Sequence, residues 1–354
     1  MHILLIQYQM LGDVLTSTII AQQLKITYPD AQIDYLIIAH ADALVAHHPA
    51  IDNLIKVTKS DFEKMSFIIS LSRKLKQKKY DLLIDAYGKN NSAVLSHLSR
   101  AKQRIGYKKW FSRLAYTDAV KNNPDTSIYK TGIALGSRML LTTPITNDVQ
   151  WHLKPKIYLT PDEKTEGKQW LLQSGIDLKK PLTMVSVLGS SANKTLPFTS
   201  MAKVLDNFVT QTGSQLLFNY IPSQKKEALA IYNACSTSTQ KHIFIDAFAP
   251  SIRDFLKVLS HCTSIIGNEG GAINMGKALD IPTFAIFSPW INKASWNVSE
   301  DGKKHISVHL QDYLPELYKD SSPKNMKSRA MELYQQFDAK LMFPDLKKFV
   351  RENY

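Results

Sequence analysis

The sequence has few cysteines and no long uninterrupted apolar stretch, and each shortage excludes a class of protein. Its 354 residues include only two cysteines, Cys235 and Cys262, which are too few for a disulfide framework or a cysteine-rich zinc site. No apolar run approaches the roughly 18 residues that span a bilayer. The opening MHILLIQYQ lacks the basic stretch and the small-residue cleavage site of a secretory signal. We therefore expect a folded, cytoplasmic protein.

Several motifs of catalytic chemistry are also missing. The link after the first expected strand holds one glycine, whereas the dinucleotide fingerprint needs three at fixed spacing. The sequence has no P-loop, no G-x-S-x-G nucleophile elbow and no D-x-D carboxylate pair. His47 and His48 are adjacent, unlike zinc ligands four residues apart on a helix. NAD-dependent, acyl-transfer and metal-hydrolytic chemistry therefore lose support.

Positive charge is in excess. Lysine and arginine number 44 against 31 acidic residues, which gives a net charge of +13 and points to a polyanionic partner: nucleic acid, a phosphorylated substrate or an acidic membrane face. Residues 100–113, RAKQRIGYKKWFSR, interleave cations with aromatic residues. This segment is either a solvated basic face over buried aromatics or a surface that docks anions or a membrane. No nucleic-acid motif appears, so we expect no nucleic-acid partner, and a polyanion-binding or nucleic-acid-binding protein is the alternative.

Short apolar runs alternate with amphipathic stretches, as in β-α-β units with a parallel sheet. This pattern predicts an α/β protein whose first half ends in a turn-rich segment, 121–160, with the domain linker late in it. The pattern then restarts at a helix opened by Thr160-Pro161-Asp162-Glu163. Expected strands are 3–7, 33–38, 53–57, 82–85, 104–106, 182–187, 215–219, 242–245, 264–266 and 283–287. Expected helices are 13–28, 62–77, 89–99, 161–174, 198–212, 223–235, 251–260, 271–279, 323–340 and 343–354.

Two Rossmann-like domains place ligand sites at the carboxyl ends of their sheets, in the cleft between them. In the first half, QYQMLGDV at 7–14 joins a strand to a helix. Gly12 can give this turn unusual backbone angles, and Asp13 stands at the start of the helix. Aspartate is a preferred helix N-cap, but a carboxylate here can also serve as a general base. The two interpretations are compatible, and both stay open.

In the second half, LGSSANKTLP at 188–197 follows a strand. Its glycine, hydroxyl residues and lysine suit a phosphate cradle, although an ordinary surface turn explains them too. A second link, IIGNEGGAINM at 265–275, carries paired glycines that let a ligand approach the positive end of a helix. Glu269 would repel a phosphate but could accept hydrogen bonds from ribose hydroxyls, and Asn274 could donate to a phosphate oxygen. The alternative is a glycine pair that only shapes a tight turn.

Together these segments resemble glycosyltransferase family 9, the ADP-heptose:lipopolysaccharide heptosyltransferases. The opening MHILLIQYQMLGDVLTSTIIAQQLKITYPDAQIDYL is similar to that family's start, and YDLLIDAYG at 80–88 is similar to its D-x-x-I-D strand. KQRIGY at 102–107 is similar to the R-I-G turn, and GNEGGAINMGKALDIPTFAIFSP at 267–289 to the D-[ST]-G-x-x-H segment. The resemblance covers nearly the whole chain.

The resemblance implies the GT-B fold, with two Rossmann-like domains whose parallel sheets face each other across a cleft. We expect an acceptor-binding domain at 1–160 and a nucleotide-sugar-binding domain at 161–334, with the tail, about 335–354, packed back on the first domain. The implied activity is inverting transfer of heptose from ADP-heptose to a lipopolysaccharide or lipooligosaccharide core. No essential metal or other cofactor is implied. The implied acceptor is an anionic lipid-linked saccharide at the cytoplasmic face of the inner membrane.

The resemblance also implies roles for single residues. Asp13 matches the base that takes the acceptor's proton. The implied donor-binding residues are Ser190, Ser191, Lys194, Glu269, Gly270, Gly271 and Asn274. The expected acceptor-binding residues are Gly12, Arg104, Lys108 and Lys109. Glu269 and Asn274 depart from the family's aspartate and histidine, and Asn274 removes a cation near the phosphates. This leaves two alternatives, a different donor or a nucleotide-binding scaffold without turnover.

Overall fold

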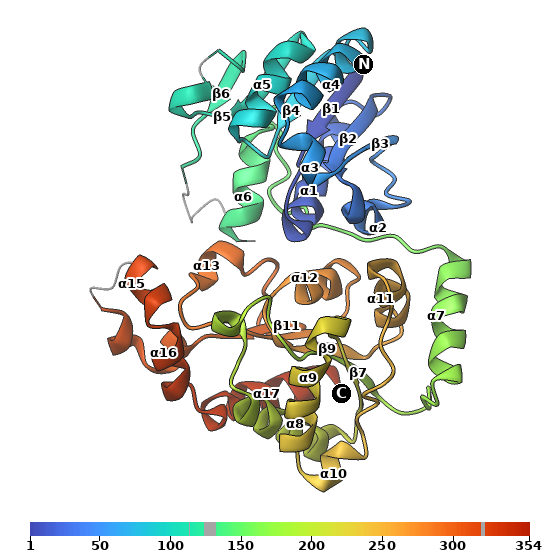
Figure 1. Cartoon of the computed structure of the whole chain (residues 1–354), viewed down its shortest axis with the longest axis vertical. Helices are drawn as coiled ribbons and strands as arrows, with labels where there is room; N and C mark the ends of the chain where they lie inside the picture. Colours follow the sequence, from blue (N-terminus) through green and yellow to red (C-terminus); the bar gives the residue numbers. More distant parts are fainter. Residues whose placement is uncertain (113, 124–131, 320–322) are drawn as a thin grey trace. The chain divides into compact units, whose positions relative to one another are not determined.

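The chain forms two compact units, Met1–Tyr158 and Leu159–Tyr354 (Figure 1). The computed structural model describes residues 1–112, 114–123, 132–319 and 323–354. Arg113 of the basic segment, and 124–131 of the segment expected to be rich in turns, lie outside the described residues.

The first unit is built on a six-stranded parallel sheet in the order β3-β2-β1-β4-β5-β6. Its strands are β1 (His2–Ile6), β2 (Gln32–Ile38), β3 (Asn53–Val57), β4 (Leu82–Asp85), β5 (Gln103–Tyr107) and β6 (Asp118–Val120). This is the Rossmann strand order, and it reverses direction between β1 and β4. Ile3, Leu4, Leu5 and Ile6 are completely buried, because a central parallel strand is covered on both faces.

The helices of this unit are α1 (Leu11–Thr27), α2 (Asp42–Val45), α3 (Lys59–Phe62), α4 (Met65–Gln77), α5 (Asn90–Ser99) and α6 (Ile133–Leu140), with short 3₁₀ turns η1 (Ala39–Ala41) and η2 (Trp110–Ser112). Helix α4 packs against α5, and α1 packs against α6. Helix α6 was not predicted, because it lies in the segment whose prolines indicated turns. Strand β6 was not predicted either.

The second unit has a five-stranded parallel sheet in the order β11-β10-β9-β7-β8. Its strands are β7 (Leu182–Ser186), β8 (Gln215–Phe218), β9 (Ser264–Asn268), β10 (Thr283–Ile286) and β11 (His305–Val308). The strand expected at 242–245 is wrong, since the segment forms only an isolated parallel bridge between Leu216 and Ile243. Strand β11 was not predicted. The strand order reverses between β7 and β9.

The helices of the second unit are α7 (Pro161–Gln173), α8 (Phe198–Thr212), α9 (Lys225–Ala234), α10 (Thr237–Gln240), α11 (Ile252–Leu259), α12 (Gly271–Ala278), α13 (Lys293–Trp296), α14 (Leu310–Tyr313), α15 (Pro323–Ser328), α16 (Ala330–Gln336) and α17 (Ala339–Asn353), with 3₁₀ turns η3 (Ala192–Lys194), η4 (Pro222–Gln224) and η5 (Pro315–Tyr318). The predicted fold class, α/β with a parallel sheet in each half, is confirmed.

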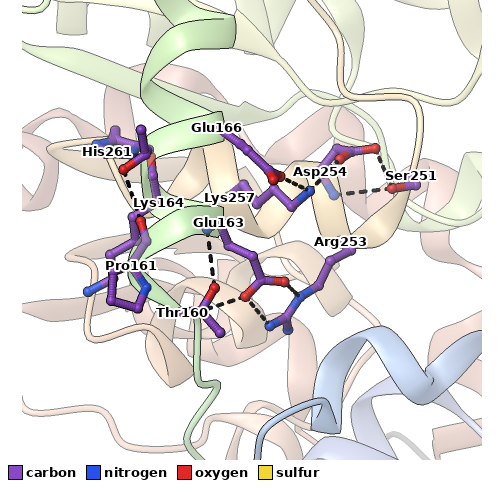
Figure 2. A network of polar contacts seen from close by, with 11 residues as sticks. Thr160, Pro161, Glu163, Lys164, Glu166, Ser251, Arg253, Asp254, Lys257 and His261 are labelled. Carbon is purple, nitrogen blue, oxygen red and sulfur yellow. Dashed lines mark hydrogen bonds and ion pairs between the residues drawn. The ribbon is translucent and has the colours of Figure 1, made fainter.

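Helix α7, the first of the second unit, is fixed at its start by polar contacts (Figure 2). Thr160 and Glu163 form a capping box, in which the Thr160 hydroxyl accepts from the Glu163 N–H at 3.2 Å and the Glu163 carboxylate accepts from the Thr160 N–H at 2.9 Å. The same carboxylate accepts two 2.7 Å hydrogen bonds from the Arg253 guanidinium on α11. Lys257 adds a 2.7 Å ion pair to Glu166. These contacts join α7 to α11.

The carboxyl-terminal tail differs from the expectation that it packs back on the first domain. Helix α17 packs against α8 and β11 of the second unit (Figure 1). Its completely buried residues Met342, Leu346 and Phe349 belong to the core of that unit, and the terminal Tyr354 hydroxyl bonds Thr183 and Ser264. The amphipathic helix is longer than the expected 343–354, so it can cover the exposed side of this sheet.

This placement predicts that Phe349→Ala destabilises the second unit by about 3 kcal/mol, because the ring is completely buried and its removal leaves a cavity. Denaturant unfolding followed by circular dichroism measures the change. Lys347→Ala, on the exposed side of the same helix, is the control and should have little effect. Equal stability of the two variants would contradict the assignment of the tail to this core.

Candidate functional site

The predicted site segments lie where each sheet reverses its strand order. In the first unit, the loops after β1 and β4 meet at the carboxyl ends of two neighbouring strands. In the second unit, the loops after β7 and β9 do the same. Ligands of open α/β sheets bind at such reversal points, because the flanking loops turn to opposite faces and leave a crevice. The loops that the sequence analysis predicted as sites therefore lie at the position in each sheet that favours ligand binding.

Asp13 lies in the first turn of α1, and its carboxylate has two protein partners. Oδ2 accepts a hydrogen bond from the Met10 N–H at 3.2 Å, which helps to cap the helix. Oδ1 forms an ion pair with the Arg138 guanidinium. A carboxylate has about four lone-pair positions, so these contacts leave capacity for an incoming hydroxyl. With 21% of its side chain exposed, Asp13 is compatible with both the capping and the general-base interpretations.

Arg138 is the main residue of this site that the sequence did not single out. It lies on α6, its side chain is 13% exposed, and its Nε donates to the Ser17 hydroxyl at 3.3 Å. A guanidinium holds a carboxylate in a defined orientation. No local signal reveals the pair, since 125 residues separate its members; only the apolar spacing of IALGSRML could have indicated the helix.

The other residues assigned to the acceptor lie at different places. Gly12 is helical, so the expectation that it supplies unusual backbone angles is wrong. The Arg104 guanidinium donates to the Ala115 and Ala101 carbonyls at 2.9 and 2.7 Å, which gives it structural contacts in the β5 turn. Lys108 is exposed. The acceptor roles of Gly12, Arg104 and Lys108 stay predictions.

Lys109 lies at a cavity of about 370 Å³ that is formed by the loops after β1 and β4, the end of α3 and the start of α5. Its ammonium donates to the Gly88 carbonyl at 2.5 Å. The pKa of Lys109 is lowered, mainly by partial burial and to a lesser extent by the nearby charge of Lys89. The Tyr8 ring, 2% exposed, forms part of the wall. The remaining lining residues are Gln9, Phe62, Glu63, Tyr87, Lys89, Asn90, Asn91 and Phe111. Polar groups beside aromatic rings suit a saccharide.

In the second unit, the serine–lysine loop (residues 188–197) is closed by tight backbone contacts. Any side chain at Gly189 would collide with the Lys194 carbonyl oxygen, 2.2 Å from an added Cβ. Ser190 and Ser191 are exposed and line a cavity of about 370 Å³. Lys194 ends the short 3₁₀ turn η3. The two serines thus lie at an open surface, as a phosphate cradle requires, and Lys194 is half-buried in the same loop.

Asn268, completely enclosed at the end of β9, fastens this loop to the sheet. Its Oδ1 accepts from the Leu196 N–H at 2.8 Å, and its Nδ2 donates to the Val187 carbonyl at 2.9 Å and the Ser186 carbonyl at 3.2 Å. An amide can make these bonds at once because it carries both a donor and an acceptor. The sequence analysis did not identify this positioning role.

The double-glycine corner (residues 268–274) follows directly. An added Cβ at Gly270 would meet nothing within 4 Å, and one at Gly271 would meet only the Met275 methyl at 3.8 Å, so space is open over the start of α12. Asn274 lies one turn into that helix. Glu269 has one oxygen, Oε1, that is buried without a hydrogen-bond partner among the described residues. Burial raises the pKa of Glu269, against the opposing effect of the Lys194 charge.

The structure therefore brings the seven predicted donor residues to one edge of the second sheet, on two adjoining loops and the first turn of α12. It also adds Trp290, whose indole Nε1 donates to the Asn193 carbonyl at 2.7 Å. Within the described parts of the chain, no group of three or more His, Cys, Asp or Glu side chains is arranged to hold a metal; metal independence stays a prediction. No helix in those parts is long and apolar enough to cross a bilayer.

Comparison with known proteins identifies the family of this chain. The model of glycosyltransferase family 9 (heptosyltransferase) matches residues 68–327. Lipooligosaccharide heptosyltransferase 2 of Haemophilus influenzae is 23% identical over 82% of this chain and 84% of its own length. The family 9 glycosyl transferase of Veillonella parvula superposes with a TM-score of 0.77 at 17% identity, covering 99% of this chain and 97% of that one. Escherichia coli ADP-heptose lps heptosyltransferase II superposes at 0.69 and 16% identity, covering 95% and 99%. The predicted GT-B class of two Rossmann-like domains is confirmed.

The unpartnered oxygen of Glu269 predicts that Glu269→Gln stabilises the protein by about 1 kcal/mol at neutral pH, since the charged carboxylate no longer has to be buried. A raised carboxyl pKa means that the native state binds its proton more tightly than the unfolded chain does. The stability that the Glu269 carboxyl contributes is therefore lost as the pH rises above 4.5, the ordinary pKa of a glutamate. The gain in stability from Glu269→Gln consequently grows from acidic to neutral pH. Thermal unfolding of the parent and the variant, once at acidic and once at neutral pH, measures this gain.

The exposed Glu316 offers the matched control, and Glu316→Gln should leave stability unchanged at both pH values. A Glu269→Gln variant that is less stable than the parent at neutral pH would show that the carboxylate is favourably solvated in the unliganded protein.

Proposed function

The chain belongs to glycosyltransferase family 9, and we propose that it transfers heptose from ADP-heptose to the core of a lipopolysaccharide or lipooligosaccharide, with inversion. The observation that carries the proposal is the pairing of the serine–lysine loop with the double-glycine corner at the reversal point of the second sheet. This edge offers a lysine and backbone N–H groups to a diphosphate. The donor and the acceptor class are those in the names of similar heptosyltransferases.

In the proposed reaction, an acceptor hydroxyl attacks the anomeric carbon of the donor in a single displacement. The new C–O bond forms as the bond to the diphosphate oxygen breaks, so the configuration at that carbon is inverted. Asp13 takes the hydroxyl proton, and Arg138 keeps its carboxylate oriented. The ADP that departs carries away the electron pair of the broken bond. Lys194 and the N–H groups at Gly270 and Gly271 stabilise its charge.

This assignment places the stabilising charge on protein groups, so the proposed reaction calls for no essential metal ion or other cofactor. Glu269 is assigned to hydroxyl groups of the donor, because its buried Oε1 lacks a hydrogen-bond donor among the described residues. Asn274, a neutral amide, can donate one hydrogen bond to a phosphate oxygen. Transfer that persists after exhaustive treatment with a chelator supports the metal-independent form of the proposal.

Asp13→Ala should lower kcat by about 10²- to 10⁴-fold, the usual contribution of a general base. Transfer of heptose to a purified core acceptor, followed by mass spectrometry of the product, provides the rate. The control is Asp30→Ala, an exposed aspartate in the turn after α1, which should retain the parental rate. Near-parental turnover by folded Asp13→Ala protein would remove Asp13 from the mechanism.

We assign contact with the membrane that holds the acceptor to the segment around Trp110. The Trp110 side chain is 91% exposed and Leu114 is 82% exposed, while Lys108 and Lys109 precede them. Apolar side chains next to cations suit an anionic lipid surface, where the former enter the interface and the latter pair with headgroups.

Reversing charge with Lys108→Glu and Lys109→Glu should weaken binding to vesicles rich in phosphatidylglycerol by at least about tenfold, since each lysine near such a surface contributes about 1 kcal/mol. Vesicle sedimentation provides the measurement. The adjacent pair Lys347→Glu and Lys348→Glu, exposed on α17, makes the same change of net charge elsewhere and should bind normally. Equal loss in both double variants would mean that net charge, and not this segment, governs binding.

A further inference from the structure

Two lysines from distant parts of the second unit converge on one aromatic ring. The ammonium of Lys194, in the serine–lysine loop, lies 5.7 Å from the centre of the Trp290 ring. The ammonium of Lys327, on α15, lies 5.3 Å from the same point. The two ammonium groups are therefore no farther apart than the sum of these distances. Lys327 played no part in the sequence analysis or in the mechanism above.

The ring between them is fixed to the donor-side loop. Trp290 Nε1 and the Ser288 hydroxyl both donate to the Asn193 carbonyl, each at 2.7 Å. The Tyr318 hydroxyl donates to the carbonyl of Pro289, the residue before Trp290, at 2.8 Å, which fixes the backbone there. The indole thus has a defined position beside Lys194. Its face attracts cations through the ring quadrupole.

The neighbouring helix approaches the same loop at a second point. Met331, on α16, lines the cavity that Ser190 and Ser191 also line. Helix α16 begins two residues after α15 ends, and the two helices are in contact, so Lys327 and Met331 lie on one continuous segment. This second contact is independent of the Trp290 ring, and it places the element that carries Lys327 beside the predicted phosphate cradle.

The charge of this cluster is not balanced. Among the described residues of the second unit (159–319 and 323–354), neither Lys194 nor Lys327 forms an ion pair. Glu269 influences Lys194 only from beyond ion-pair distance. Two like charges near one ring repel each other. An anion with two charged groups, bound between them, would relieve this repulsion.

We propose that Lys327 is a second donor-binding cation, which together with Lys194 holds the diphosphate of the nucleotide-sugar, with Trp290 as the platform that presents both. The inference rests on the proposed function, since it names a further residue of the same donor site. A lysine ammonium on a flexible four-carbon stem can leave the ring face and contact a phosphate oxygen. We assign Lys327 to the second phosphate of a nucleoside diphosphate, so that it favours a diphosphate over a monophosphate.

The test is calorimetric titration of the full-length protein with ADP and with AMP. Lys327→Ala should weaken ADP binding by about tenfold, which is typical of losing one charge-assisted contact, and AMP binding by much less. Lys327→Arg keeps the charge and should recover most of the ADP affinity. Lys194→Ala serves as the reference for a lysine already assigned to the diphosphate. Lys347→Ala, an exposed lysine on α17, is the control that should bind both nucleotides normally.

The outcomes separate this inference from the proposed function. If the parent protein binds ADP and Lys194→Ala weakens that binding, whereas Lys327→Ala binds like Lys347→Ala, the role of Lys327 is overturned and the donor site stands. An equal loss of ADP and AMP affinity in Lys327→Ala, without recovery by arginine, also overturns it, because the effect is then structural. If the parent binds neither ADP nor any other nucleoside diphosphate, the proposed function itself fails.

Discussion

Both sheets consist only of parallel strands, and this constraint places every loop that follows a strand at one edge of its sheet. The edge is open only where the strand order reverses, between β1 and β4 in one unit and between β7 and β9 in the other. Buried polar groups then set the loops at these points. Asn268 of β9 bonds both the serine–lysine loop and Ser186 at the end of β7. Buried Asp85, at the end of β4, accepts hydrogen bonds from the Gly88 N–H in the loop that follows and from the Tyr116 hydroxyl.

The site residues are held at some cost to stability, as is common where binding needs groups that folding does not. Burial raises the pKa of Glu269, and one of its oxygens lacks a partner among the described side chains. Lys194 and Lys327 share the Trp290 ring as two cations. Asp13 differs, because Arg138 pairs with its carboxylate. A diphosphate would complement the charge of the two lysines and donor hydroxyl groups would complement the Glu269 oxygen, whereas Asp13 already has its partner in the protein.

The sequence predicted what local pattern controls. Apolar runs located most strands, and glycine and hydroxyl residues after them located both donor-side loops. Three features were not predicted, because they depend on distant contacts or have a weak local signal. Arg138 meets Asp13 across 125 positions of sequence, and its helix lies in a segment where prolines indicated turns. Strand β11 has only four residues and begins with histidine, so it has no apolar run that would predict a strand. The tail was placed by resemblance, whereas Phe349 and its neighbours fill the core of the second unit.

The central claim is that a nucleoside diphosphate binds at the reversal point of the second sheet. Hydrogen exchange measured by mass spectrometry, with and without saturating ADP, tests it most directly, because the method locates protection along the chain. The account predicts slower exchange in peptides that cover 188–197 and 268–274, with little change in the first unit. Protection confined to the first unit, or equal exchange with and without ADP throughout the second, would contradict it.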